Sequence, residues 1–171
     1  MPPERELAPG EWAILALLCE GEAHGWALVR ALAPEGEIGR VWSVKRALVY
    51  RGIETLTARR LVETTGTAQG LRGKSRTVLR ATGGGRAAVS AWLGEPVEHV
   101  RDARSLLLLK LLFLSRGGRS PRTLLRKQAR VLARIEAALE RQASSGDGAE
   151  RMLASFRLET TRAVSRFVDG V

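Results

Sequence analysis

The stretch SVKRALVYRGIETLTARR, residues 43–60, decides how this chain folds. Its apolar side chains recur with the period of an α-helix, since Val49, Ile53 and Leu56 stand at i, i+4 and i+7 and share one face. The basic and polar residues lie mostly on the other side of the helix. They are Lys45, Arg46, Arg51, Thr55 and Arg59. The stretch therefore predicts an amphipathic helix near residues 44–58, with an inward apolar stripe and a basic outer surface.

Upstream of this stretch, the chain predicts two more helices. Residues 12–19 read WAILALLC and indicate an apolar helix that ends before Gly21. Residues 24–32 read HGWALVRAL and indicate a short second helix, with His24 capping the turn before it. Proline and glycine around residues 34–39 interrupt the chain again before the basic helix begins.

Downstream, two runs rich in β-branched residues, 61–65 and 76–80, flank the glycine-rich basic segment GTAQGLRGKS at residues 66–75. Strands around a glycine-rich tip predict a hairpin. The order is then helix, helix, basic helix, basic hairpin, which is the arrangement of a winged helix-turn-helix domain. In that fold the third helix presents side chains to base edges in the major groove, and the hairpin reaches adjacent phosphates or the minor groove.

The remainder of the chain predicts a mainly helical second domain. Three helical segments are expected, at residues 102–115, 120–142 and 149–169. Each has an apolar stripe that needs a partner, within the chain or in a second subunit. The expected fold class is mainly α with a small β-hairpin wing. A winged helix-turn-helix DNA-binding domain at residues 1–96 precedes a helical dimerisation domain at residues 97–171.

Charge is distributed unevenly along the chain, whose net charge is +10. Residues 40–86 contain eleven Lys or Arg against two Glu, and residues 101–142 contain eleven against three acidic residues. Basic blocks indicate a polyanion partner, because cations that neutralise phosphates release condensed counterions. A solvated basic face without a partner is the alternative that charge alone leaves open.

Composition favours a cytoplasmic protein. The opening MPPERELAPG is polar and unlike a signal peptide. The most apolar run, residues 106–114, is shorter than the ~20 residues that span a bilayer, so no membrane partner is expected. The single cysteine, Cys19, excludes an internal disulfide and fits a reducing compartment.

Several motifs, in unbroken order over about residues 7–96, resemble the PadR family of bacterial transcriptional regulators. ILALLCEGEAHGWAL at residues 14–28 resembles the family's opening helix and its His-Gly-Tyr turn. WSVKRALVYRGIETLTARRLVE at residues 42–63 resembles its recognition helix. SRTVLRATGGGRAAVSAWL at residues 75–93 resembles the return strand of the wing and the Leu-Thr-x-x-Gly entry to the next helix. The later helices are similar in pattern to the family's longer subgroup, which has an extended helical C-terminal domain.

The sequence departs from the family pattern at several positions. Trp26 replaces the usual tyrosine, and Ile53 replaces the usual leucine while keeping the apolar stripe. Arg60 stands where glycine is usual, at the turn from helix to wing, and so puts the geometry of that turn in question. Val78-Leu79 replaces a tyrosine pair, which removes wing contacts without removing the strand.

The resemblance implies a homodimer, joined through its C-terminal helices, that represses transcription from a pseudo-palindromic operator in double-stranded DNA. For some members it also implies release from DNA by a small aromatic or amphipathic effector. Geometry supports dimerisation independently, because one recognition helix reads too few base pairs for genomic specificity, whereas two read half-sites ~34 Å apart. No cofactor is expected. The alternative function is a non-catalytic adapter that keeps the winged fold and binds acidic proteins.

Eight side chains are the candidate DNA contacts. Lys45 and Arg46 lie in the first turn of the basic helix, where bases or phosphates are within reach, and Arg51 lies a turn further on. Tyr50 has two interpretations, a hydroxyl contact to phosphate or packing at the edge of the core. The wing cations are expected to contribute affinity and salt dependence more than sequence choice. The full set is Lys45, Arg46, Tyr50, Arg51, Thr55, Arg72, Lys74 and Arg76.

Two small residues affect the expected geometry of the basic helix. Ser43 is a candidate N-cap, because its hydroxyl can accept a hydrogen bond from an unpaired N–H of the first turn. Gly52 lies inside the helix and costs about 1 kcal/mol relative to alanine there. A glycine at this position permits close approach to another backbone or to DNA.

Other residues have both a functional and a structural interpretation. Trp92 is the candidate ligand contact, by stacking on a planar effector, and packing between the two domains is the alternative. Cys19 is either a redox sensor or, because it lies on an apolar helix without a neighbouring base, a buried structural thiol. The two histidines are too few and too far apart for a metal site. The basic helix at residues 120–142 has three interpretations, a solvated outer face, a partner surface or an accessory DNA contact, and the first is favoured.

Residues 68–75, AQGLRGKS, match a relaxed phosphate-loop pattern. That motif needs a helix after it to point N–H groups at phosphates, whereas here a strand-like run follows. The segment is therefore interpreted as the wing tip. No Ser/His/Asp set and no paired carboxylates emerge from the sequence, and an enzyme is not expected.

Overall fold

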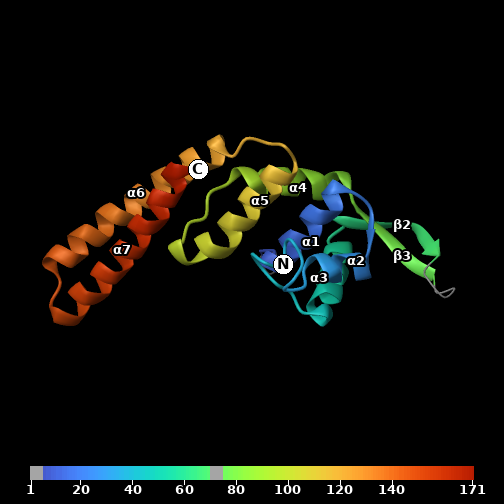
Figure 1. The fold of residues 1–171 in the computed structure, drawn as a ribbon, viewed down its shortest axis with the longest axis horizontal. Helices are drawn as coiled ribbons and strands as arrows, with labels where there is room; N and C mark the ends of the chain where they lie inside the picture. Colours follow the sequence, from blue (N-terminus) through green and yellow to red (C-terminus); the bar gives the residue numbers. More distant parts are fainter. Residues whose placement is uncertain (1–5, 70–74) are drawn as a thin grey trace. The chain divides into compact units, whose positions relative to one another are not determined.

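The computed structural model describes residues 6–69 and 75–171. The chain divides into two compact units, residues 1–93 and residues 94–171 (Figure 1). The first unit contains the basic helix and the wing, and the second contains the C-terminal helices.

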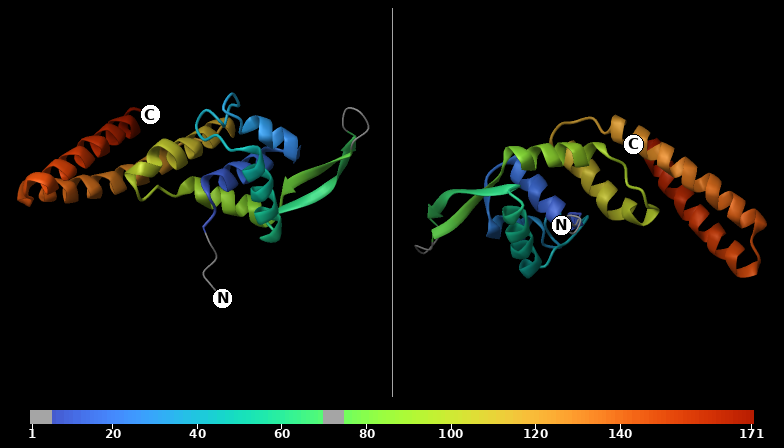
Figure 2. Two further views of the ribbon diagram at one scale, coloured as in Figure 1. Left: turned by 90° about the horizontal axis from the view of Figure 1, so that it is seen from below. Right: turned by 180° about the vertical axis from the view of Figure 1, so that it is seen from behind.

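The first unit has the element order of a winged helix-turn-helix domain, which confirms the predicted fold class. Its sheet is three-stranded and antiparallel, in the order β1-β3-β2. Strands β2 and β3 form a hairpin that extends past the helices of this unit (Figure 2). The elements are α1 (Pro9–Glu20), β1 (Ala23–His24), α2 (Gly25–Ala31), α3 (Arg46–Ala58), β2 (Val62–Gln69), β3 (Ser75–Ala81) and α4 (Gly83–Gly94).

Helices α1 and α3 pack against each other in the core of this unit. Val49 and Leu56 are fully buried, as the predicted apolar stripe requires. Ile53, its third member, is only half-buried, and Gly52 is buried instead. A Cβ on Gly52 would lie 2.8 Å from Cδ1 of Ile14 in α1, so the glycine lets the two helices approach. The close neighbour of Gly52 is therefore a side chain of α1.

The start of α3 differs from the expectation for Ser43. The helix begins at Arg46, Lys45 occupies the N-cap position, and no side chain caps the first turn. The N–H of Val44 donates to the carbonyl of Leu32 at 2.9 Å. This bond holds the chain outside the helix until Lys45, so the predicted cap at Ser43 is wrong because Ser43 lies two residues too early.

The end of α3 turns into the wing through Arg60, whose φ of 57° lies in the left-handed region. The N–H of Leu61 donates to the carbonyl of Leu56, and the N–H of Arg60 donates to the carbonyl of Thr57, each at 2.9 Å. This pair of bonds forms a Schellman motif, in which glycine is usual at the left-handed position. Arginine therefore bears backbone strain where PadR sequences usually have glycine.

Strand β1 was not predicted from the sequence. It has only two residues, and it pairs with β3 so that Ala23 stands opposite Leu79. Two residues are too few to show the alternation that identifies a strand, so only the adjacent edge of β3 reveals it.

The pairing of β2 with β3 shifts register between Thr64 and Gly66, which marks a β-bulge.

Thr82 joins the end of the wing to α4. Its Oγ1 donates to the carbonyl of Arg60 at 2.8 Å and accepts from the N–H of Gly85 at 3.0 Å. A Cβ on Gly85 would lie 2.2 Å from the carbonyl oxygen of Leu61, so no larger residue fits there without movement of the backbone. These contacts give a physical reason for the Thr-x-x-Gly pattern at this junction.

The second unit is helical wherever it has regular structure. Helices α6 and α7 lie side by side as an antiparallel hairpin (Figure 1). The predicted first segment is irregular at its start, where a 3-10 turn and a π-helical turn precede the α-helix. The elements are η1 (Val100–Asp102), η2 (Ala103–Leu107), α5 (Leu108–Arg116), α6 (Arg122–Ser145) and α7 (Gly148–Gly170). Among the described residues, none of the helices has the length and apolarity needed to cross a membrane.

Buried polar side chains support the irregular segment that opens the second unit. The N–H of Val97 donates to Oε1 of Gln128 at 2.8 Å, and Nε2 of Gln128 donates back to the carbonyl of Val97 at 3.0 Å. The Nζ of Lys110 donates to the carbonyl of Glu95 at 2.6 Å. Because this segment lacks strand or helix partners, these side chains satisfy its backbone instead.

Candidate nucleic-acid interface

The start of α3 presents three cations to solvent. Lys45, Arg46 and Arg51 are all exposed. Within residues 6–69 and 75–171, none of the three forms an ion pair or donates a side-chain hydrogen bond to the protein. Exposed cations without acidic partners produce a positive surface potential that attracts a polyanion.

Arg46 differs from the other two cations in its surroundings. Its guanidinium carbon lies 5.7 Å from the ring centroid of Trp26 and 5.8 Å from that of Tyr50. Both distances are within the range of cation–π attraction. The rings come from α2 and α3, and both remain partly exposed, at 43% for Trp26 and 38% for Tyr50. Arg46, Trp26 and Tyr50 therefore form one cluster, here called the Arg46 clamp.

The N-terminus of α2 fixes one side of this clamp. The N–H of Ala27 donates to Nδ1 of His24 at 3.0 Å, which confirms the predicted cap. A Cβ on Gly25 would lie 2.8 Å from Cε1 of Tyr50, so the absence of a side chain lets α2 approach that ring. Trp26 follows directly and is therefore anchored by its two neighbours in sequence.

A groove of about 880 Å³ lies between α3, the start of α2 and β3. Its lining includes the three clamp residues, together with Ile53 and Arg76. This position explains why Ile53 is only half-buried, because its side chain borders the groove instead of the core. The groove brings a residue of the helix surface, Arg46, and a residue of the wing, Arg76, to one concave surface.

Of the three wing cations predicted to contact DNA, Arg76 of β3 is the one that lies among the described residues. Its Nη1 lies 3.4 Å from Nε2 of His24. Since Nδ1 of His24 accepts from Ala27, a neutral ring carries its proton on Nε2. The contact then joins two N–H groups, and His24 is a neighbour of Arg76 without being its acceptor.

The remaining predicted contacts lie elsewhere. Thr55 is half-buried, and its Oγ1 donates to the carbonyl of Arg51 at 3.0 Å, within the helix. Arg72 and Lys74 lie outside the described residues. The structure thus brings Arg46, Tyr50 and Arg76 together at the groove and adds Trp26, which the sequence marked only as a replacement for tyrosine. Lys45 and Arg51 are exposed on α3 and do not line the groove.

Trp92 lies in the core of the first unit. It is 8% exposed and stacks on Trp12 of α1, with ring centroids 5.0 Å apart and an interplanar angle of 6°. The stacked pair joins α1 to α4. Packing between these two helices is the role that its contacts support.

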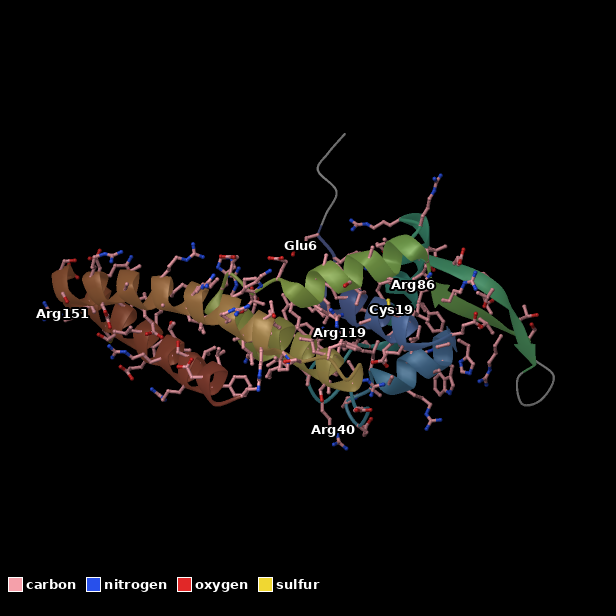
Figure 3. The ribbon with its side chains drawn as sticks, turned by 90° about the horizontal axis from the view of Figure 1, so that it is seen from above. Glu6, Cys19, Arg40, Arg86, Arg119 and Arg151 are labelled. Carbon is pink, nitrogen blue, oxygen red and sulfur yellow. The ribbon has the colours of Figure 1, made fainter. Side chains whose placement is uncertain are left out.

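Cys19 lies near a basic side chain that is distant from it in the sequence. The side chain is half-buried on α1, close to Arg86 of α4 (Figure 3). Burial raises the pKa of the Cys19 thiol, and Arg86 offsets only part of this effect. A raised pKa favours the unreactive thiol at neutral pH. No group of three or more His, Cys, Asp or Glu that could hold a metal ion occurs among the residues described.

Two surfaces of the second unit stand out. Helix α7 exposes large apolar side chains, which are Met152, Leu153, Phe156 and Phe167. Helix α6 exposes a row of arginines at intervals of four residues, which are Arg122, Arg126, Arg130 and Arg134. Exposed apolar side chains in this number are unusual on a surface that faces water. The arginine row of α6 belongs to the basic block at residues 101–142.

The element order and the exposed cations of α3 define the first unit as a winged helix-turn-helix domain with a basic third helix. The chain is similar to the probable transcriptional regulator Rv1176c of Mycobacterium tuberculosis, with 29% identity over 96 residues, 56% of this chain. The match covers 49% of that protein, so this chain spans about half the length of its curated relative. No family model matches the chain.

Among solved structures, the chain is similar to PadR of Bacillus subtilis in complex with operator DNA, with 21% identity, a TM-score of 0.48 and 97% of each chain covered. It is also similar to B. subtilis PadR in complex with p-coumaric acid, with 19% identity, a TM-score of 0.43 and 98% and 95% of the two chains covered.

Proposed function

We propose that this chain is a sequence-specific DNA-binding transcriptional regulator of the PadR type. The observation that carries the proposal is the group of exposed cations at the start of α3, next to the wing, which have no acidic partner among the described residues. The first turn of α3 enters the major groove, where Lys45 and Arg46 reach base edges or phosphates. Arg51 and the wing residues Arg72, Lys74 and Arg76 contact the backbone of the DNA.

The regulator acts as a homodimer that represses transcription from a pseudo-palindromic operator. The apolar side chains exposed on α7 support this part, because burying them against a second copy removes apolar surface from water. Residues 94–171 are then the dimerisation domain. Two recognition helices together read enough base pairs for specificity.

The proposal includes release from DNA by a small planar effector, with Trp92 as its candidate contact. Because Trp92 stacks on Trp12, an effector at this residue has to separate the two indole rings. A titration with planar aromatic acids, followed by near-ultraviolet circular dichroism, detects this separation as loss of the stacked-indole signal. An unchanged signal alongside release from DNA would place the effector elsewhere.

The proposed function is tested by measuring binding to promoter DNA, including the chain's own promoter, at several salt concentrations. A specific complex that survives physiological salt supports the regulator. Binding that is weak and indifferent to sequence contradicts it and favours the adapter that binds acidic proteins. Arg46→Ala is expected to weaken specific binding most, whereas Lys74→Ala weakens binding to all DNA about equally.

A further inference from the structure

We infer that Trp26 determines specificity: with Tyr50 it holds the guanidinium of Arg46 so that its N–H edge faces a guanine. This inference rests on the proposed DNA-binding function and deepens it. Trp26 acts through Arg46 and is a positioning residue, not a DNA contact itself.

Two aromatic rings lie close to the guanidinium of Arg46. Ring centroids from two different helices lie 5.7 and 5.8 Å from the guanidinium carbon of Arg46. Aromatic rings attract a guanidinium through its flat face and leave its in-plane N–H donors unused. Within the described chain, Arg46 has no carboxylate or carbonyl partner that would occupy those donors.

Contacts at the start of α2 hold the two rings of the clamp in position. His24 caps the first turn of α2 through its 3.0 Å bond from Ala27, and Gly25 lies close against the ring of Tyr50. Within residues 6–69 and 75–171, Lys45 and Arg51 have no aromatic ring or side-chain partner to order them. Among the three cations of α3, Arg46 is therefore the one whose orientation is set before DNA arrives.

A fixed guanidinium edge fits one base better than the others. Guanine presents two acceptors, O6 and N7, in the major groove, and a bidentate arginine is the commonest contact to this pair. Such a contact discriminates against a wrong base by roughly ten- to a hundredfold. A mobile arginine makes the same two hydrogen bonds to guanine, but it pays an entropy cost when the bonds order its side chain. The clamp lowers this cost, and it therefore contributes part of the preference for guanine.

The test selects binding sites from a random duplex pool with the full-length protein and its variants. Trp26→Leu removes the ring and keeps an apolar side chain, whereas Trp26→Phe keeps an aromatic face. Trp42→Leu is the matched control, because Trp42 is exposed to 38% and lies outside the groove. We expect Trp26→Leu to lose the guanine preference at one position of each half-site by about tenfold, with Trp26→Phe retaining most of it.

Non-additivity shows whether Trp26 acts through Arg46. Arg46→Ala abolishes the preference at the same position, and adding Trp26→Leu to it changes nothing further. The slope of log affinity against log salt stays unchanged in Trp26→Leu, because no phosphate contact is lost. Equal losses in Trp26→Leu and Trp42→Leu, or a further loss in the Arg46→Ala background, would overturn the inference.

A measurement without DNA keeps this inference separate from the proposed function. In the free protein, ring currents shift the NMR signals of the Arg46 δ-methylene upfield, and Trp26→Leu reduces the shift. If wild-type protein shows the upfield shift but selects no DNA sites, the proposed function is wrong and the clamp is still supported. If the protein selects sites but the Arg46 signal is unshifted, the clamp is wrong and DNA recognition is still supported.

Discussion

Arg60 has a backbone conformation that glycine adopts at much lower cost. Its φ of 57° lies in the left-handed region, where a Cβ approaches the carbonyl oxygen. We expect Arg60→Gly to stabilise the chain by about 0.5–1 kcal/mol, because relief of this strain exceeds the extra entropy of an unfolded glycine. Urea unfolding measures the change in the free energy of unfolding.

The adjacent Arg59 supplies the control for this prediction. Its φ of −81° is ordinary for any residue, so Arg59→Gly gains no relief of strain. We expect that variant to lose about 0.5 kcal/mol or more, because glycine adds entropy to the unfolded chain. Loss of stability in Arg60→Gly would mean that the arginine side chain makes contacts worth more than the strain.

Substitution of Gly52 by alanine is predicted to destabilise the fold, because the Cδ1 methyl group of Ile14 on α1 lies too close. Alanine would gain about 1 kcal/mol of helix propensity. Its Cβ would lie 2.8 Å from Cδ1 of the fully buried Ile14, and overpacking of this kind costs about 1–3 kcal/mol. We expect Gly52→Ala to lower the free energy of unfolding by about 1 kcal/mol in urea denaturation.

Ile14→Val removes the obstructing Cδ1 and provides the matched background. It costs about 1 kcal/mol by itself, through the lost methyl group. In that background, Gly52→Ala is expected to stabilise, because only the propensity gain remains. The same loss from Gly52→Ala in both backgrounds would show that the restriction at residue 52 does not come from Ile14.

Cys19 is predicted to react slowly. Burial raises the pKa of its thiol, so at pH 7 less thiolate is present than on an ordinary cysteine, and the reactive fraction rises only as pH approaches the raised value. We expect iodoacetamide to alkylate the folded protein at pH 7 several-fold more slowly than the urea-unfolded protein. A folded-state rate equal to or above the unfolded one would indicate that Arg86 dominates and would revive the redox interpretation.

Side-chain roles at this scale were predictable when they depended on neighbours in sequence. The cap made by His24 follows from its place before a helix start, and it was found. The neighbour of Cys19, by contrast, is Arg86, which is distant in sequence and comes close only through the packing of α4. Trp26 was missed as a functional residue for the same reason, since its partners stand on α3.

At the scale of single helices, the arginine row on α6 is predicted to destabilise its own helix. Arg122, Arg126 and Arg130 are exposed and spaced at i, i+4 and i+8, and each like-charged pair costs about 0.2–0.5 kcal/mol. Arg126→Glu turns two repulsions into two attractions, so we expect a gain of about 1 kcal/mol in thermal unfolding at low salt. Arg126→Gln should give about half of that.

High salt separates this electrostatic cause from others. At 1 M salt the Debye length falls to about 3 Å, so the gain from Arg126→Glu should largely disappear. A gain that persists at high salt, or a loss at low salt, would contradict the interpretation of this surface as a solvated face. The arginine would then be making a favourable contact of its own.

Elements with strong periodicity were predicted, and those that depend on an adjacent edge or an irregular turn were not. The hairpin and the long helices were anticipated because β-branched runs around a glycine-rich tip and helical apolar stripes are local signals. Strand β1 and the π-helical turn at Ala103–Leu107 have no such signal. Ile53 followed the helical stripe but borders the groove, because Gly52 allows α1 to pack beside it.

At the scale of the whole molecule, each unit exposes a different characteristic surface. The first unit exposes the cations at the start of α3, and the second exposes the apolar residues of α7 together with the arginine row of α6. A protein that binds a two-fold symmetric operator needs both properties, one for the DNA and one for a second copy. The proposed DNA contacts could be assigned to α3 from the sequence because their charge is written in it, whereas the proposed dimer surface could be assigned only to the C-terminal helices as a group, since exposure is a property of the folded chain.

The second copy is therefore predicted to bind at α7. Phe156 is 72% exposed, and a charge at its position would have to be buried in the dimer without a partner. We expect the wild-type protein to sediment as a dimer at micromolar concentration and Phe156→Asp to weaken the dimer by at least tenfold. Binding to the full operator should weaken in parallel, whereas binding to an isolated half-site should not change.

Ser155→Asp is the control for this prediction, because it adds the same charge at the neighbouring exposed residue without removing apolar surface. If both variants dissociate the dimer equally, the added charge is responsible and Phe156 is not an anchor of the interface. If Phe156→Asp remains dimeric while operator binding falls, the apolar surface of α7 serves another partner, and the second copy binds elsewhere on residues 94–171. Only dissociation by Phe156→Asp alone supports α7 as the interface, since burial of a large apolar side chain is what distinguishes the two positions.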